Sequence, residues 1–327
     1  MSVHALYEPL IERDLDAIPA AARTFAAEHG SDELFKAVAR FAILAYAPSQ
    51  HAKHAVLACL AVHELRDGLG ARFDDALIEC AIYTASSRQP WSEPPILDPP
   101  ALDDAQRGDA AEVLAAIGEG DRLRAERWLA KTMHGADFPR EFFRVAATDF
   151  EDLGHKLIVA TAAWKLAALL GDKGKYAALR IAVWEWTAYR GRAYGEQGIA
   201  LDPETLFARL ADNLFCAAGS IVCTHALFLL DAALEASSLA NNPRVATRVR
   251  DYLTNYTNAT DATIAPPLDR APDEVPVYRF ARDYAGCLKM YAMTKRLAAR
   301  WPDLPLQKMR DTAWHNLEHG EAYSDIG

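Results

Sequence analysis

Residues 50–67, QHAKHAVLACLAVHELRD, form an apolar, alanine-rich segment that carries three histidines. Helix-forming residues dominate this segment and most of the chain, whereas the alternation of β-branched residues that marks a strand is nearly absent. Only the apolar runs PVYRF, from residue 276, and SIVCTHALFLL, from residue 220, could suggest strands. We therefore predict an all-α fold, a multi-helix bundle of antiparallel helices with two long Pro-rich loops.

Short connections, such as GLGARFDD from residue 68, predict that successive helices are antiparallel neighbours. We expect one α-helical domain over 1–327, in which two closely packed halves could meet near 103–108. The expected helices cover residues 5–28, 32–46, 50–67, 73–87, 109–118, 121–133, 138–148, 151–170, 174–190, 203–239 with a break, 243–256, 278–299 and 305–321.

The two long loops are expected at 88–104 and 258–276, where prolines prevent a continued helix and aspartates favour turns. Long ordered loops in a compact helical protein often cover a binding site. A surface excursion is equally compatible with these sequences.

Composition limits the class of protein. The chain has 327 residues, of which 51% are hydrophobic, and a net charge of −10. A substantial core is therefore expected, and the lack of any block of Lys and Arg argues against nucleic acid as a partner. The charged N-terminus lacks the features of a signal peptide, and no apolar run approaches the ~18 residues of a membrane span, so we expect a cytoplasmic protein. The oligomeric state stays open.

The cysteines are too few and too scattered for a disulfide framework, and none forms a C-x-x-C pair. We expect them to be small buried hydrophobic residues. They are Cys59, Cys80, Cys216, Cys223 and Cys287.

The first histidine cluster lies in the opening segment. His51 and His54 share a helical face, a spacing that metal-binding helices also use. His63 lies nine residues after His54, about 180° away at 3.6 residues per turn, so the three cannot all face one site. We expect His54 to face inward and His63, with Glu64, to mark the solvated end of the helix. A structural or surface role is the common alternative for a single helical histidine.

The second candidate is His155, at the start of the apolar stretch that follows DFEDLG. Asp149, Glu151 and Asp152 favour a helix start here, which places His155 in the first turn. The helix dipole there disfavours the imidazolium and favours a neutral base, although the nearby acids oppose this effect. Hydrogen bonding to a capping acid is the alternative role.

The third candidate is His225, within the nearly uncharged stretch 214–230. A segment of this kind is expected to be buried, so the imidazole needs either a hydrogen-bond partner or a cavity. We predict that His54 and His225 face the same internal cavity, with Thr224 as a local polar neighbour. A core histidine bonded to a backbone carbonyl is the alternative.

The last histidine pair, His315 and His319, has i, i+4 spacing, with Glu318 beside the second. The glutamate is not where H-E-x-x-H requires it, so the metalloprotease signature is absent. A solvated helix end explains the pair equally well.

Other motifs narrow the field. No G-x-G-x-x-G follows a strand, and neither a P-loop nor a G-x-S-x-G motif is present, so Rossmann, P-loop and α/β-hydrolase folds lose support. The paired E-x-x-H motifs of a di-iron bundle are also missing. Aromatic residues are plentiful around 183–194, so a planar aromatic ligand is expected, although packing is their commoner role. The candidate substrate-binding residues are Trp91, Trp164, Trp184 and Thr224.

Three segments together resemble the questin oxidase-like family: HAVLACLAVHE from 54, FDDALIECAIYTASSRQPW from 73 and CTHALFLLDA from 223. The family has an early His-x-x-[IL] helix, a helix ending in a Pro-containing loop and a later Thr-x-His-Ala helix. Leu57 follows His54 as that pattern requires, whereas Thr224 adjoins His225 directly. The resemblance covers the chain in patches, and the chain is shorter than many fungal members.

The resemblance implies an oxidoreductase that performs Baeyer–Villiger oxygenation or ring cleavage of an aromatic polyketide. By resemblance, His54 and His225 are catalytic, with His155 and His319 as looser matches. A neutral histidine could remove a phenolic proton, and a second could donate to a developing oxyanion. The sequence leaves open whether NADPH or a metal is needed.

Two other functions stay open. A non-haem metal oxygenase would use His54, His155 and His225 as ligands, because neutral imidazoles suit Fe, Cu and Zn. A non-catalytic helical protein would instead bind a small aromatic molecule without acid/base chemistry.

Overall fold

The computed structural model describes residues 1–48, 50–87, 108–213, 220–258, 270–277 and 284–319. Within these ranges all regular secondary structure is helical, so the predicted all-α fold is confirmed. Neither run that could have suggested a strand forms one: SIVCTHALFLL begins a helix, and the described part of PVYRF is irregular. The loop expected at 88–104, and most of the one expected at 258–276, lie outside the described residues.

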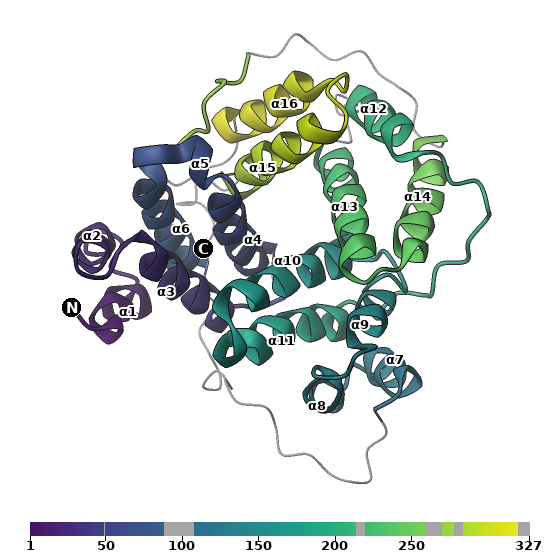
Figure 1. Cartoon of the computed structure of the whole chain (residues 1–327), viewed down its shortest axis with the longest axis horizontal. Coiled ribbons are helices and arrows are strands. Elements are labelled where there is room, and N and C mark those ends of the chain that lie inside the picture. Colours follow the sequence, from purple (N-terminus) through teal and green to yellow (C-terminus); the bar gives the residue numbers. More distant parts are fainter. Residues whose placement is uncertain (49, 88–107, 214–219, 259–269, 278–283, 320–327) are drawn as a thin grey trace.

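Four helices surround the centre of the molecule in Figure 1. They are α4 (Gln50–Glu64), α10 (His155–Leu170), α13 (Ser220–Leu239) and α15 (Tyr284–Arg300). Each packs against the next long helix of the chain, which lies farther from the centre. These outer helices are α6 (Phe73–Ser87), α11 (Asp172–Ala188), α14 (Pro243–Asn258) and α16 (Leu306–His319).

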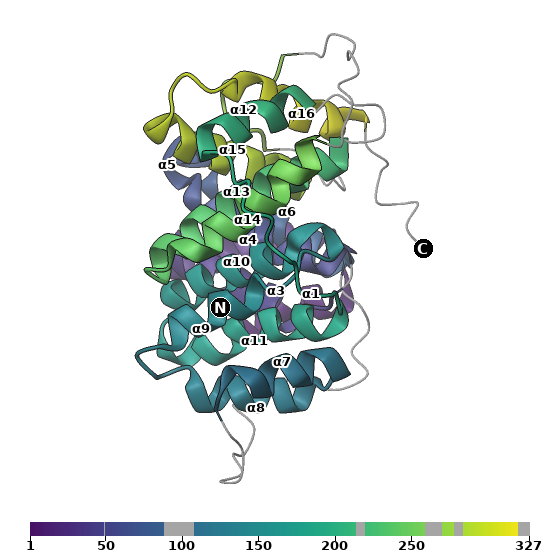
Figure 2. The same ribbon diagram turned by 90° about the vertical axis from the view of Figure 1, so that its right-hand side faces the viewer.

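The remaining helices extend this arrangement outward. Figure 2 shows it turned by 90°, with α12, α15 and α16 at one end and α7 and α8 at the other. The further elements are α1 (Val3–Glu12), α2 (Ile18–His29), α3 (Ser31–Leu44), α5 (Arg66–Leu69), α7 (Ala110–Glu119), α8 (Arg122–Thr132), α9 (Phe138–Ala146), α12 (Pro203–Asn213) and the 3₁₀ turns η1 (Gly70–Arg72) and η2 (Asp152–Gly154).

The helix predicted over 5–28 is in fact two helices, α1 and α2, because the chain turns at Arg13. Arg13 adopts a left-handed conformation (φ 60°), and its Nε donates to the carbonyl of Ala85, 3.1 Å away. Pro19 lies in the first turn of α2, where its missing N–H costs nothing. The prediction was wrong here because periodicity alone does not detect a turn that a long-range contact stabilises.

One continuous core runs through the helices, from Leu6 in α1 to Ala313 in α16. Cys59, Cys80 and Cys287 are buried in it as expected, while the side chains of Cys216 and Cys223 lie outside the described set. The expectation that no segment could span a membrane needs correction, because Asp152–Leu170 is long and apolar enough. In this structure 72% of its most apolar window is buried by neighbouring helices, as in the core helix of a globular protein.

Candidate functional site: three histidines at one end of a central cavity

The structure brings together three of the histidines singled out in the sequence. His54, His155 and His225 come from three different inner helices, and their available nitrogen atoms lie within 4.8 Å of one another. The ring centroids of His155 and His225 are 4.8 Å apart, and those of His54 and His155 are 5.3 Å apart. The Nε2 atoms of His54 and His155 are separated by 3.1 Å.

The turn η2 fixes the orientation and the tautomer of His155. The Nδ1 of His155 lies 2.6 Å from the backbone carbonyl of Asp152, and a carbonyl can only accept, so Nδ1 carries the proton. In the neutral ring, Nε2 is then an acceptor that faces His54. Asp152, Leu153 and Gly154 all have positive φ, and a Cβ on Gly154 would lie 2.7 Å from Leu229. Strain of this kind in a non-glycine turn is often found at functional sites.

A buried network of ion pairs stabilises the turn η2. Lys53, which is 1% exposed, forms ion pairs with the carboxylates of Asp152 and Glu185. Glu185 also accepts a 2.5 Å hydrogen bond from the hydroxyl of Tyr46. Lys53 adjoins His54 in α4, and Asp152 lies in the turn just before His155. The ion pair between Lys53 and Asp152 therefore connects the two segments that carry these histidines.

The surroundings keep His54 and His155 neutral. Burial lowers the pKa of His54 well below its usual range, with the charge of Lys289 as the next cause. Burial also lowers the pKa of His155 well below its usual range, followed by the effect of His225 and of Lys53. Neutral imidazole is the form that binds a metal or accepts a proton.

A cavity of about 60 Å³ begins one helical turn beyond the histidines, and its lining does not include His54 or His225, which were predicted to face it. Each of α4, α10 and α13 contributes four lining residues to the cavity. In every case these are the third, sixth, seventh and tenth residues after the histidine of that helix. The third positions, Leu57, Ile158 and Phe228, form an apolar layer next to the imidazoles. Lys289 of α15 also lines the cavity. All four helices therefore run from the histidine end toward the opposite end.

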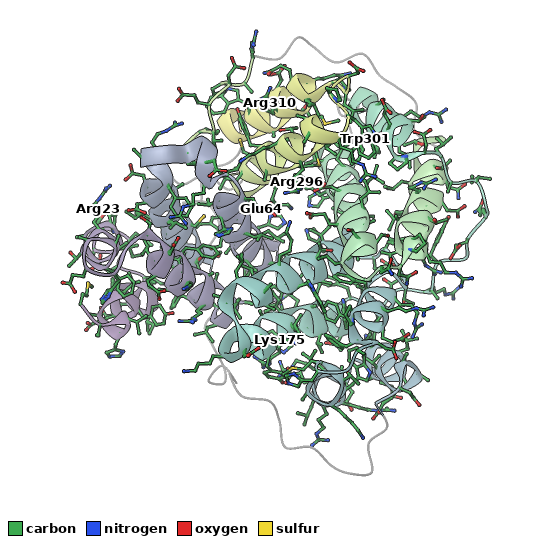
Figure 3. The ribbon with its side chains drawn as sticks, viewed as in Figure 1. Arg23, Glu64, Lys175, Arg296, Trp301 and Arg310 are labelled. Atoms are coloured by element: carbon green, nitrogen blue, oxygen red, sulfur yellow. The ribbon has the colours of Figure 1, made fainter. Side chains whose placement is uncertain are left out.

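Paired charges line the opposite end of the cavity. Arg296 forms ion pairs with Glu64, Asp231 and Glu235, and Lys165 forms ion pairs with Glu64 and Glu235. Figure 3 shows Glu64 and Arg296 at the centre of the ring of helices. Glu64 was expected at a solvated helix end, but its side chain is 19% exposed and forms part of this ionic cluster.

The other predicted residues lie elsewhere. Trp164 packs against Phe138, Phe142 and Phe143, and the indole of Trp184 donates to Glu126; neither lines the cavity. His63 stacks on Phe35 outside the cluster, as the helical angle requires. Trp91 lies outside the described residues, and so do the side chains of His51, His315 and His319.

Thr224 is buried beside His225, and no described group accepts or donates a hydrogen bond at its Oγ1. It shares a helical face with Phe228 and Asp231, which line the cavity.

Sequence reasoning missed Lys53 and Lys289. A lysine inside an apolar helical run is the signal that could have identified Lys53, because a buried ammonium requires partners. Lys289 lies between ordinary helix residues and becomes recognisable only once its neighbours are known.

The donor set fits a transition-metal ion. A tetrahedral site with bonds of about 2.0–2.1 Å places neighbouring ligand nitrogens roughly 3.3 Å apart, close to the 3.1 Å between His54 and His155. The Nδ1 bond from His155 to a carbonyl is also the outer contact that metal-bound histidines usually make. The ligand nitrogen of His225 lies within 4.8 Å of the other two.

Comparisons with known proteins add no relative: no family model, no curated protein and no solved structure matches the chain. The site therefore stands on its own geometry.

Proposed function

We propose that the chain is a metal-dependent oxygenase in which His54, His155 and His225 hold one transition-metal ion beside a small substrate cavity. The observation that carries the proposal is the convergence of three imidazole nitrogens from three helices within 4.8 Å. Three neutral nitrogen ligands suit Fe, Cu or Zn and leave coordination positions open. Such an ion, once bound, would supply Lewis-acid or redox chemistry toward dioxygen.

The choice of oxygenation among metal reactions rests on the resemblance to the questin oxidase-like family. Ring cleavage with both atoms of dioxygen needs no further reductant, whereas a Baeyer–Villiger insertion would need one such as NADPH. A cavity of about 60 Å³ favours a single hydroxylated ring or an enol over a large polyketide.

The protein's own residues have distinct parts in this proposal. The carbonyl of Asp152 holds His155 in the tautomer whose Nε2 lone pair faces the other histidines. The layer of Leu57, Ile158 and Phe228 excludes water from the side of the imidazoles that faces the cavity.

A second candidate uses the histidines without a metal. The 3.1 Å contact between the Nε2 atoms of His54 and His155 is also a hydrogen bond, in which His54 donates and His155 accepts. The lowered pKa values keep both rings neutral, and the nitrogen of His54 that this hydrogen bond leaves unused could accept the proton of an acidic phenol.

Metal analysis of the purified protein separates the two. We expect about one Fe, Cu or Zn per chain after reconstitution, and at least about 100-fold weaker metal binding in His54→Ala, His155→Ala and His225→Ala. His63→Ala is the matched control, since His63 belongs to α4 but stacks on Phe35. Equal metal binding in all five proteins would contradict the metal site.

If no metal binds, turnover decides between the acid/base reaction and simple ligand binding. His225→Ala should then lower turnover of a hydroxylated quinone or phenol by about 10²–10⁴-fold with its helical circular dichroism intact. No turnover by the wild type, with unchanged ligand affinity in the variant, would leave a non-catalytic binding protein.

A further inference from the structure

Among the described residues of the four inner helices, α15 contributes no side chain at the level of the three histidines, because Gly286 stands there. The fourth inner helix, α15, lines the cavity with Lys289, Ala292 and Arg296. These are the third, sixth and tenth residues after Gly286, and the other three helices use the same positions after their histidines. Gly286 therefore takes the place of a histidine. A Cβ built on Gly286 meets no atom of the described residues within 4 Å, so none of these residues fills the space beside α15 at this level.

One turn further along α15, Lys289 brings an amine to the cavity. Its Nζ lies 4.1 Å from the centroid of the Phe228 ring, in a cation–π contact. Among the residues that the structure describes, no carboxylate forms an ion pair with Lys289, whereas Arg296 on the same helix has three. Burial, and then repulsion from Lys53, lower the pKa of Lys289 to about 7.

The surroundings favour a negative charge at this place. The four inner helices begin near it: His155 is the first residue of α10, and Lys289 is the sixth of α15. Helix N-termini carry partial positive charge. The hydroxyl of Thr224, 7% exposed as a residue and with no described partner, lies on the α13 face that lines the cavity.

We propose that Lys289 binds the ionised oxygen of an acidic phenol or enol in the space between Gly286 and the three histidines. The proton of the substrate O–H moves to Nζ, the O–H bond breaks, and an ammonium–phenolate pair results, with no change in oxidation state. The phenolate ring is then electron-rich beside the histidines. Oxygenation of this phenolate rests on the proposed function, whereas binding of the phenolate by Lys289 needs no metal.

The test uses 4-nitrophenol, because its anion absorbs visible light and its neutral form does not. Metal-stripped protein is titrated with the probe at one pH unit below the pKa of the free phenol. The proteins are wild type, Lys289→Met, Lys289→Arg and the control Lys295→Met, whose lysine lies on α15 with its side chain 49% exposed.

We expect wild type and Lys295→Met to bind the probe as the coloured anion, and Lys289→Arg to retain part of this signal. Lys289→Met should lose the anion signal and bind at least tenfold more weakly. The inference is overturned if Lys289→Met binds the anion as tightly as wild type, or if wild type binds only the colourless form. The form of 4-nitrophenol that the wild type binds is measured without any variant, so this test remains valid even if a substitution prevents folding.

The two proposals fail separately. Absence of metal from the reconstituted wild type would remove the proposed function and leave anion binding by Lys289 intact. Anion binding by metal-loaded protein alone would show that the ion, and not Lys289, anchors the substrate, and would overturn the inference.

Discussion

The two ends of the central cavity are built by the same helices and have opposite electrostatics. At one end lie three imidazoles, of which His54 and His155 are held neutral by burial, and Lys289 has no described carboxylate partner. At the other end, ten residues further along α4, α10 and α13, Glu64, Lys165 and Glu235 are joined with Arg296 in an ion-pair network. Ten residues of helix span about 15 Å.

The two ends differ in whether their polar groups are paired with opposite charges. The ionic end satisfies its own charges and ties the four helices together. The histidine end leaves its donor atoms facing one another, and the charges that support it, Lys53 with Asp152 and Glu185, lie behind the rings. Each prediction below changes one end and leaves the other as reference.

The largest effect is expected at the support of the histidine end. Lys53→Met leaves the carboxylates of Asp152 and Glu185 without a cation, and Glu185 is 0% exposed. The free energy of unfolding should fall by about 3–5 kcal/mol, the usual cost of breaking a buried ion pair. Urea unfolding measures it, with Lys36→Met at an exposed i, i+3 pair as the control. A loss below about 1 kcal/mol would mean that the network does not support the turn.

Acid should destabilise the histidine end next. His54 and His155 have lowered pKa values in the folded protein, whereas unfolded histidines titrate near about 6.5. Below that pH the unfolded state takes up protons that the folded state does not, so stability falls as the pH falls, by about 1.4 kcal/mol per pH unit for each ring.

Urea titrations of metal-free protein above and below that pH measure the slope. His54→Gln should remove about half of the histidine contribution. A slope identical to that of wild type would contradict the lowered pKa of His54.

At the ionic end, Arg296→Met should cost less. The side chain of Arg296 is 32% exposed, so solvent screens its bonds to Glu64 and Asp231. We expect a loss of about 1–2 kcal/mol in the free energy of unfolding, which high salt reduces, and no change in metal binding. A loss of metal from this variant would show that the two ends are coupled.

The smallest effect is expected at Gly286. Replacing a glycine inside a helix by alanine stabilises it by up to about 1 kcal/mol, and the added methyl group meets no atom of the described residues within 4 Å. Thermal unfolding should therefore show a small gain for Gly286→Ala, while affinity for 4-nitrophenol falls. A stabilised variant with unchanged affinity would place the ligand away from Gly286.

Sequence patterns sufficed for the helices and for His54, His155 and His225 as separate candidates, because apolar periodicity and a histidine in an apolar run are local signals. The sequence predicted a shared site for His54 and His225 and offered all three histidines as possible metal ligands. The contact between His54 and His155, 101 positions apart, depends on packing that no local pattern encodes. The left-handed turn at Asp152 and the burial of Lys53 depend on the same tertiary contacts. The repeated spacing after each histidine is present in the sequence, but only the structure shows that the residues at these positions line one cavity.

The most direct measurement is X-ray absorption at the metal edge of the reconstituted protein, compared with His225→Gln. The account predicts three imidazole nitrogens at about 2.0–2.1 Å in the wild type and one fewer, or no bound ion, in the variant. A spectrum without imidazole ligands in the wild type, or one unchanged by His225→Gln, would contradict a metal centre built from these three histidines.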